Sequence, residues 1–434
     1  MAPMKTVLIV AEHFPPAFSV GGKRPYRLAR YLPDHGWRPI ILTTSEPSPS
    51  RSDVSPHPLP GSAVLDRSLH PFWWPRSRGG SSDGTRSEPS TDSLARPGPA
   101  AKALEAIDFP LGPKRFLVPH ILRRARYLVE RHKVDAIFIT LGPSFLAGVA
   151  TQVKRRIGLP LCLDFRDPWS LNFHQRKKPQ WVRESEARME HRALKSADRV
   201  LFTCGQASEA YRQLYPDLPP ERIGTLYNSF DPSHAPAQVD VAPESGTIDL
   251  LHFGNCYGPR KLESVIRAIY EVRTRRVFGA EKLRLVNLGR PAATDLELVK
   301  KLKLEDSFRS ESLVPYSEGI RRLSTAPVQI LLGYGEEKLY VPAKTFDYFM
   351  SGAPVLSLSE STELDSMIEK TGRGLSVRPN DIEGVTEALI EILKAARDGK
   401  RICEPRRKDV EEFSAPNAAG KLATTLNDMV GPRR

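Results

Sequence analysis

The chain has 434 residues, which exceeds the size that one hydrophobic core usually serves and predicts two domains. Hydrophobic residues make up 40% and charged residues 26% of the sequence, as in an ordinary globular protein, and no apolar run is long enough to span a bilayer. The net charge of +13 is compatible with three kinds of partner: nucleic acid, an anionic membrane surface or phosphorylated ligands. Because the sequence holds no zinc-finger spacing, RNP motif or basic zipper, we expect no nucleic-acid partner.

The cysteines and the first residues predict a cytoplasmic protein. The apolar run TVLIV near the start is too short for the core of a signal peptide. No cysteine stands in a CxxC pair, and three of them fall in or beside apolar strand-like runs, so we expect buried free thiols. The four are Cys162, Cys204, Cys256 and Cys403.

The first half of the chain alternates short apolar strands with helices, which predicts a parallel α/β sheet. A strand at 6–11, a helix at 23–36 that Gly36 ends, and a strand at 39–44 form one βαβ unit. The alternation resumes with helices at 121–132, 145–156 and 181–195 and strands at 136–140, 160–165, 199–204 and 222–228. Residues 1–230 are therefore predicted to form a first Rossmann-like domain.

One segment, residues 46–100, breaks this pattern. It is rich in proline and serine, and its charges balance, so we expect a disordered insert. Within it, the adjacent Trp73 and Trp74 of PFWWP predict contact with a partner surface or a membrane interface. The basic stretch from Lys114 to Lys133 follows. Such charge on a helix usually indicates a solvated face, and peripheral attachment at the inner face of an anionic membrane is the second interpretation.

The second half repeats the same alternation after a polar linker at 231–246. We expect a second Rossmann-like domain at 247–412, and a helix within 413–434 that packs back on the first domain. The fold class is therefore α/β, with two Rossmann-like domains facing across a cleft. The expected strands are 248–253, 283–288, 328–333, 354–359 and 374–377, and the expected helices are 260–273, 296–302, 343–351, 363–370, 382–396 and 415–429.

Candidate ligand contacts lie in the loops after strands, because parallel sheets bind ligands at the carboxyl ends of their strands. After the first strand, His13 is followed by Gly21 and Gly22, which would let the backbone approach a ligand at a helix N-terminus. After the strand at 160–165, the run DFRDPW places Arg166 and Asp167 beside Asp164. These charges indicate either an arginine–carboxylate clamp that ties the loop or contacts with a substrate.

The second domain offers two further runs. In HFGNCYGPRK, Gly254 would permit close approach, and Arg260 with Lys261 at a helix start suits a diphosphate. In VPAKTFDYF, Lys344 and Asp347 lie three residues apart and share one helix face, so the carboxylate can accept hydrogen bonds from sugar hydroxyls, although a plain surface pair has the same spacing. No metal and no cofactor is predicted, because two carboxylates without further ligands do not make a metal site.

The chain resembles glycosyltransferase family 4, the large retaining family, in the subgroup with a DFRDPW strand end. The matching runs span 7–377 in family order, apart from the insert. They are VLIVAEHFPPAFSVGGKRPYRLARYL, ITLGPSF with LCLDFRDPW, SADRVLFTC, LYNSFDP, HFGNCYGPRKLESVIRAI and VPAKTFDYFMSGAPVL.

The resemblance implies a B-type glycosyltransferase that uses a nucleotide-diphosphate-sugar donor, held mainly by the second domain, and a saccharide or lipid-linked acceptor on the first. Asp347 matches the second acid of the family's Glu-x7-Glu motif, which holds the donor ribose, whereas the first acid is replaced by Leu339. Asn255 stands at the usual arginine position, Arg260 at the usual lysine, and Arg166 where many relatives have histidine.

Two other functions remain open at this level. One is a nucleotide-sugar epimerase of the same fold, which would need extra acids and a histidine around the sugar. The other is a relative that binds nucleotide-sugar without transfer, which the missing first acid suggests. Detection of donor hydrolysis or sugar transfer separates that relative from an enzyme.

Overall fold

The computed structural model describes residues 4–15, 20–44, 59–67, 117–142, 145–235, 247–277, 282–335, 337–398 and 405–431. Its contacts divide the chain into two compact units. Unit 1 comprises Met1–Phe202, Tyr211–Gly224 and Ala419–Arg434, and unit 2 comprises Thr203–Ala210 and Thr225–Ala418. Each is built around one sheet of parallel strands with helices beside it, so the predicted α/β class with two Rossmann-like folds is confirmed.

The sheet of unit 1 has the strand order β3-β2-β1-β4-β5-β6-β7 among the described residues, and the pairings from β3 to β6 are all parallel. Its central strands are apolar and buried on both faces, which is the signature of a sheet covered by helices. The strands are β1 (Lys5–Ala11), β2 (Trp37–Thr43), β3 (Val64–Asp66), β4 (Ala136–Leu141), β5 (Leu161–Phe165), β6 (Arg199–Phe202) and β7 (Ile223–Thr225).

Helices connect these strands in the manner of βαβ units. The last helix of the chain, α14, clusters with unit 1 from Ala419 onward, and Gly420 lies against the ring of His35. Lys5 of β1 donates hydrogen bonds to Asn427 and to the carbonyl of Gly431 (3.1 Å each). The α-helices that the structure describes in this unit are α1 (Val20–Tyr31), α3 (Val118–His132), α4 (Phe145–Ile157) and α5 (Gln180–Ser196). The helices α6 (Gly205–Leu214) and α14 (Ala415–Val430) belong to it in part.

The strand β3 corrects one prediction. We expected the whole of 46–100 to lack structure, but residues 59–67 are ordered and β3 pairs with β2. Asp66 at the end of β3 is buried and forms an ion pair with Arg124 of α3, which gives this short strand a tertiary anchor. The rest of the proposed insert, including PFWWP, lies outside the described residues, as do Lys114 and Arg115 of the basic stretch.

The sheet of unit 2 has the order β10-β9-β8-β11-β12-β13 among the described residues, and its pairings are parallel. In both sheets, the chain moves first to one side of its initial strand and then to the other, as in dinucleotide-binding folds. The strands are β8 (Thr247–Phe253), β9 (Lys282–Leu288), β10 (Phe308–Glu311), β11 (Val328–Leu332), β12 (Val355–Leu358) and β13 (Gly374–Val377).

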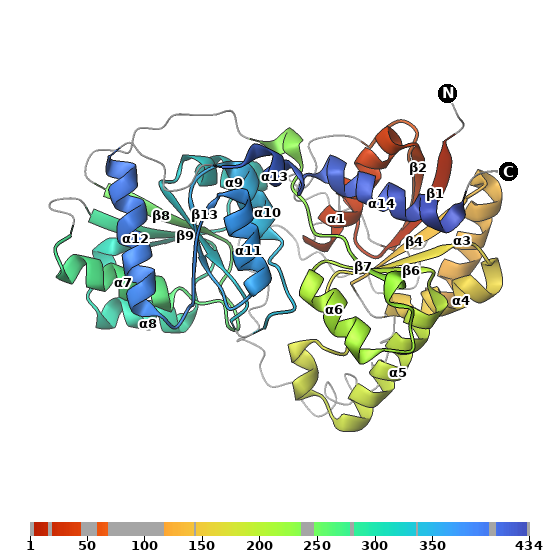
Figure 1. Cartoon of the computed structure of the whole chain (residues 1–434), viewed down its shortest axis with the longest axis horizontal. Coiled ribbons are helices and arrows are strands. Elements are labelled where there is room, and N and C mark those ends of the chain that lie inside the picture. The colour runs from red at the N-terminus through yellow and green to blue at the C-terminus, as the bar shows by residue number, and fades with distance from the viewer. Residues whose placement is uncertain are drawn as a thin grey trace, which may run out of the picture. The chain divides into compact units, whose positions relative to one another are not determined.

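Helices cover both faces of this sheet (Figure 1). The helices α7, α8 and α12 lie on one side of it, and α9, α10 and α11 lie on the other. The bounds are α7 (Glu263–Thr274), α8 (Ala293–Lys301), α9 (Tyr316–Thr325), α10 (Lys344–Ser351), α11 (Thr362–Thr371) and α12 (Ile382–Arg397), followed by the short α13 (Arg407–Glu411).

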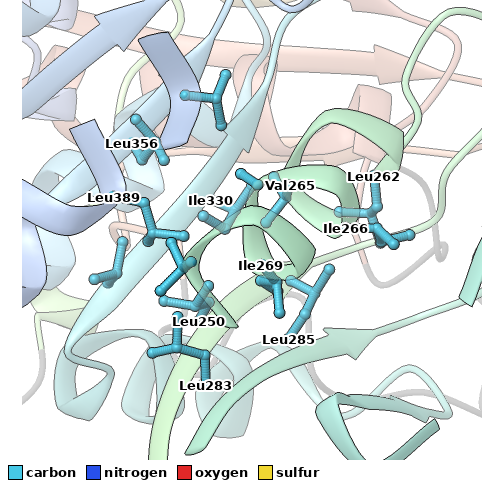
Figure 2. Close-up of a cluster of buried hydrophobic side chains, with 14 of the residues drawn as sticks. Leu250, Leu262, Val265, Ile266, Ile269, Leu283, Leu285, Ile330, Leu356 and Leu389 are labelled. Carbon is cyan, nitrogen blue, oxygen red and sulfur yellow. The ribbon is translucent and has the colours of Figure 1, made fainter. Parts of the chain in front are cut away.

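The core under α7 and α12 is purely aliphatic where Figure 2 shows it. Val265 and Ile269 of α7 and Leu389 of α12 point onto strand residues such as Leu250 and Ile330, and all five are fully buried or nearly so. Burial of such side chains contributes roughly 1.5–3 kcal/mol each. This packing fixes α7, and with it the loop that leads from β8 into α7.

The expected elements agree with the structure to within a few residues. The prediction omitted the helices α6, α9 and α13, the strand β3 and the edge strand β10. The polar run FRSE of β10 carries no apolar signal, so its pairing with β9 sets its conformation.

The expectation of buried free thiols is confirmed for Cys162, Cys204 and Cys256. No helix in the described ranges combines the length and the apolar character needed to cross a membrane.

Candidate functional site

In unit 1, the strand order reverses between β1 and β4, and the predicted residues gather at the carboxyl ends of these strands. Gly21 lies in the first turn of α1, and Gly142 follows β4. A Cβ atom on either glycine would overlap the guanidinium of Arg166. Both glycines therefore make room for Arg166, which occupies the space that we had predicted for a ligand beside Gly21.

The neighbouring Gly22 has a different constraint. A Cβ atom there would lie 3.4 Å from the backbone of His13 and Phe14, so the start of α1 packs tightly on the loop after β1. His13 itself is about one-third exposed, and its Nε2 lies 4.0 Å from a carboxylate oxygen of Glu12. The geometry thus brings His13, Gly21, Gly22 and Arg166 into one neighbourhood, while their roles in substrate binding remain predictions.

The clamp on Asp164 of DFRDPW comes from Arg24 of α1. Asp164 is fully buried in β5, and Arg24 of α1 holds it with both Nε and Nη2, the shortest contact being 2.6 Å. Burial lowers the pKa of the Arg166 guanidinium, whereas the negative charges of Asp167 and Asp164 act in the opposite direction. Asp167 is exposed, so it faces solvent in the structure.

Two buried acids of α5 fasten the loop that follows. Glu190 accepts hydrogen bonds from Tyr211 (2.6 Å) and from the backbone of Ser170 (3.2 Å). Glu186 accepts from the indole of Trp169 (3.2 Å) and from Gln175 (2.6 Å). Burial raises the pKa of Glu190 in spite of these bonds. The DFRDPW loop is therefore rigidly supported, as a binding loop requires.

In unit 2, the order reverses between β8 and β11, and two glycines bring the backbone close at the ends of β8 and β9. Gly254 and Gly289 have φ angles of +135° and +144°, which side-chain-bearing residues rarely adopt. A Cβ atom on Gly289 would lie 2.5 Å from the carbonyl of Gly254. A Cβ atom on Gly254 would overlap Nζ of Lys344, so this ammonium group lies directly over the Gly254 backbone.

Arg260 is the most unusual residue of this region. Its side chain is buried, with 4% exposure, between the rings of Tyr257 and Tyr334, whose centroids lie 5.5 and 5.3 Å from the guanidinium carbon. Nη1 donates to the Tyr257 hydroxyl (3.4 Å), whereas Nε and Nη2 are buried with no hydrogen-bond partner among the described residues. Because unsatisfied buried donors are costly, these two groups indicate a binding site for an anion.

Besides burial, the positive charges of Lys344 and Arg260 both lower the pKa of His252. His252 of β8 is completely buried, and its pKa lies well below the usual value because of burial first and the charges of Lys344 and Arg260 in addition. Asn287 of β9 holds Nδ1 of this ring (2.6 Å), and the amide of Asn287 donates to the Gly289 carbonyl (2.7 Å). The imidazole is therefore neutral, and the positive field comes from the lysine and the arginine.

The remaining predicted residues have clear positions. Asp347 lies in the first turn of α10 and is buried, and the hydroxyl of Tyr316 donates to its Oδ1 (2.7 Å). The side-chain carbonyl of Asn255 accepts from the backbone of Arg290 (2.9 Å), so it shapes the loop. Lys261 is exposed, one residue before the N-cap of α7.

Asp295 supports the same loop from α8. Its carboxylate accepts hydrogen bonds from the backbone of Leu262 (3.2 Å) and of Ala292 (3.2 Å), and burial raises its pKa. It thereby joins the starts of α7 and α8 and fixes the chain direction just after Arg260.

A cavity of ≈ 870 Å³ elsewhere in unit 2 is lined by residues of α11 and β13, and none of the predicted site residues lines it.

Sequence reasoning missed the two tyrosines around Arg260 and the partner of Asp347. Tyr334 follows β11 and could have been found by the rule that led to Gly254, because it also stands at the carboxyl end of a central strand. Tyr316 begins α9, a helix that was not predicted. In the described part of the chain, no group of three potential ligands for a metal ion comes together.

Comparison with known proteins agrees with this geometry. Residues 21–229, just under half of the chain, match the sequence profile of the glycosyl transferase 4-like domain. No curated protein sequence matches the chain significantly. The amino-terminal half therefore carries a glycosyltransferase-like sequence, whereas the second half is compared through its fold.

Solved structures resemble the chain over nearly its full length. Sucrose-phosphate synthase from Thermosynechococcus elongatus is 16% identical with a TM-score of 0.65, and the match covers 98% of both chains. A glycosyltransferase from Rickettsia africae is 11% identical with a TM-score of 0.64, covering 99% of this chain and 100% of that one. The Anabaena protein HepE in complex with UDP-glucose is 13% identical with a TM-score of 0.53, covering 98% of both. At these identities the likeness shows the fold, which is the B-type glycosyltransferase fold.

Proposed function

We propose that this protein is a glycosyltransferase that moves a sugar from a nucleotide-diphosphate-sugar donor to a glycan or lipid-linked acceptor, with retention at the anomeric carbon. The observation that carries the proposal is Arg260, a buried guanidinium with two unpartnered donors among the described residues, at the carboxyl end of β8. A diphosphate supplies acceptor oxygens and negative charge of the kind these donors need. The glycosyl transferase 4-like domain in residues 21–229 supports the same activity.

The donor is assigned to unit 2. Arg260 and Lys344 provide two positive charges near one pair of glycines, Gly254 and Gly289, where backbone atoms can approach phosphate oxygens. Asp347, at the start of the neighbouring α10, would accept hydrogen bonds from the ribose. Lys261 and Asn255 lie in the same loop and complete the assignment. HepE, a protein of the same fold, has been solved in complex with UDP-glucose, which supports a nucleotide-sugar donor.

The reaction needs no enzymic covalent nucleophile. The bond between the anomeric carbon and the leaving phosphate oxygen breaks, and the acceptor hydroxyl forms a new bond on the same face of the sugar. The proton of that hydroxyl passes to an oxygen of the departing diphosphate. Cations held in place before the reaction stabilise the negative charge that develops on the phosphate, and this electrostatic effect is the main contribution of Arg260 and Lys344.

The acceptor is assigned to unit 1. His13, Arg166 and Asp167 stand at the carboxyl ends of β1 and β5, next to a loop that Glu186 and Glu190 hold rigidly. The exposed Asp167 can accept hydrogen bonds from sugar hydroxyls, and Arg166 can bind an anionic group of the acceptor. A lipid-linked acceptor would also account for the basic face of α3.

A two-stage experiment tests the proposal. Thermal shift with a panel of nucleoside diphosphates and nucleotide-sugars should reveal one base that raises the melting temperature, because a ligand stabilises the fold that it binds. The corresponding nucleotide-sugars are then incubated with the protein, and release of nucleoside diphosphate is measured together with the anomeric configuration of the product. Binding without hydrolysis or transfer would identify a non-catalytic nucleotide-sugar-binding protein, and no stabilisation by any nucleotide would contradict the proposal outright.

A further inference from the structure

The hydrogen bond between Tyr316 and Asp347 joins two helices at the proposed ribose position. Tyr316 is the first residue of α9, Asp347 lies in the first turn of α10, and the two helices pack together. The phenol oxygen lies 2.7 Å from Oδ1 of the carboxylate. The phenol O–H donates and the carboxylate oxygen accepts, and a hydrogen bond from a neutral donor to a carboxylate is a strong one.

The two partners differ in exposure. Asp347 is buried, with 8% of its surface accessible, whereas Tyr316 is half-buried. Tyr316 is therefore the more exposed residue of the pair. The ring of His234 meets the ring of Tyr316 edge to face, with centroids 5.5 Å apart and an interplanar angle of 89°. Packing thus restricts the ring of Tyr316, and its oxygen occupies a defined place.

We propose that Tyr316 is a specificity-determining residue of the donor site, whose phenol oxygen accepts a hydrogen bond from a ribose hydroxyl while its O–H donates to Asp347. This inference rests on the proposed function, because it assumes a nucleoside diphosphate bound at Arg260 and Lys344. The oxygen of a phenol keeps acceptor capacity when its proton is donated, and donation to a carboxylate strengthens that capacity.

The side-chain lengths fit this arrangement. Asp347 stands where the glycosyltransferase resemblance places a glutamate, and an aspartate is shorter by one methylene group. We therefore assign the ribose hydroxyl to the phenol of Tyr316, the more exposed of the two hydrogen-bonded residues. The two residues then form a chain of two hydrogen bonds: the ribose hydroxyl donates to the phenol oxygen, and the phenol donates to the carboxylate.

The consequence is discrimination between ribose and deoxyribose. A nucleotide without the relevant hydroxyl cannot donate this hydrogen bond to the phenol oxygen, and polar sites built to bind a hydroxyl reject analogues that lack it. We expect the ribonucleoside diphosphate to bind about tenfold more tightly than at least one of its 2′-deoxy and 3′-deoxy analogues. The base of the probe is the one that the nucleotide panel selects.

Calorimetry on the full chain tests the inference with four proteins: wild type, Tyr316→Phe, Asp347→Asn and the double variant. Tyr316→Phe removes only the oxygen, so it should weaken binding of the ribonucleotide and abolish the preference over the deoxy analogue. Because the two residues act as one acceptor, the double variant should be little worse than either single variant. Tyr270→Phe, an exposed tyrosine of α7 in the same unit, is the matched control and should leave the preference unchanged.

Two results would overturn the inference while leaving the proposed function intact. The first is wild-type protein that binds ribonucleotide and both deoxy analogues equally, a measurement that needs no variant. The second is a folded Tyr316→Phe protein that keeps the full preference, which would make Tyr316 a packing residue. Failure of wild type to bind any nucleoside diphosphate would instead contradict the proposed function itself.

Discussion

Arg24 holds Asp164 inside the sheet of unit 1 through a buried two-pronged ion pair. Nε donates at 2.9 Å and Nη2 at 2.6 Å, and the exposed fractions of the two side chains are 6% and 0%. The contact joins the helix α1 to the interior strand β5. It also explains why Asp164 occurs within the apolar strand β5, because Arg24 of α1 supplies the opposite charge.

Removal of one partner of this pair should be strongly destabilising. Asp164→Asn leaves the guanidinium of Arg24 buried without its counter-charge, and such changes cost about 3–5 kcal/mol. Urea unfolding of the variant and of wild type measures the difference. Arg267→Gln, which breaks an exposed pair with Glu263 on α7, is the control and should change the stability by less than about 0.5 kcal/mol. A loss below about 1 kcal/mol for Asp164→Asn would contradict the structural role.

Arg260→Ala should weaken binding of the nucleoside diphosphate that the panel selects. A charge-assisted contact contributes about 1.5–3 kcal/mol, which corresponds to a tenfold to hundredfold loss of affinity. Calorimetric titration of the folded variant gives the value, with Arg267→Ala as a control for simple loss of positive charge near α7. Equal affinity of Arg260→Ala and wild type would remove Arg260 from the donor site.

His252 should make unit 2 sensitive to acid. Its pKa is well below the ordinary value of about 6.5 in the folded protein, so the unfolded chain binds a proton more readily. The free energy of unfolding is therefore unaffected by His252 above pH ~6.5. Below that pH it falls by up to about 1.4 kcal/mol per pH unit, because the unfolded chain takes up a proton that the folded chain does not. Urea unfolding at pH 7.5 and 5.5 should show this loss.

The matched variant for that experiment is His252→Gln, which stays polar but does not titrate. The free energy of unfolding of this variant should fall less between pH 7.5 and 5.5 than that of wild type. The difference should be about 1.4 kcal/mol, because one titrating group has been removed. His120→Gln, at an exposed position of α3, should leave the wild-type difference unchanged. If His252→Gln shows the same pH dependence as wild type, other groups govern the acid sensitivity.

The ordered strand β3 changes what a deletion should do. Deletion of a wholly disordered insert would be nearly neutral, but deletion of 46–100 also removes Asp66, whose carboxylate accepts a hydrogen bond from Nη2 of Arg124 at 2.6 Å. Asp66→Ala should lower the unfolding free energy by about 1–2 kcal/mol. Arg126→Gln, which breaks an exposed pair with Glu130 on the same helix, should cost less than about 0.5 kcal/mol. Indistinguishable unfolding curves for Asp66→Ala and wild type would show that β3 contributes nothing.

Attachment to an anionic membrane is testable on α3. Arg124 forms an ion pair with Asp66, and the exposed Arg126 forms one with Glu130. Arg123 and Lys133 are also exposed. Basic residues near an anionic leaflet contribute about 1 kcal/mol each at low salt. Sedimentation with phosphatidylserine vesicles should pellet the protein, and Arg123→Gln with Lys133→Gln should reduce the pelleted fraction. Equal recovery with neutral and anionic vesicles at low salt would exclude the attachment.

Strand and helix positions could be predicted because buried parallel strands and amphipathic helices leave periodic patterns in the sequence. The same logic located Gly254 and Arg260, since ligand loops follow strands in this fold. It could not reveal that Arg24, rather than Arg166, pairs with Asp164, because 140 residues separate the two partners in the chain. Nor could it show that Gly21 and Gly142 accommodate a side chain of the protein itself.

The tyrosines of unit 2 show the other limit. Tyr316 and Tyr334 are distant in the sequence from the residues they contact, and only the fold places Tyr334 beside Arg260 and Tyr316 beside Asp347. Each is an unremarkable residue in its local sequence, so no local pattern marks it. Side-chain constellations assembled across a sheet therefore stay hidden until the strand order is known.

The packing of α14 on unit 1 has a consequence for synthesis. Residues from Ala419 onward belong to unit 1, and Leu422 and Leu426 of α14 are fully buried. The ribosome makes residues 225–418 of unit 2 before this helix, which takes on the order of 10–40 s at about 5–20 residues per second. During that interval, the nascent amino-terminal sheet lacks its last helix, and the apolar surface that α14 covers is open to chaperones or to neighbouring nascent chains.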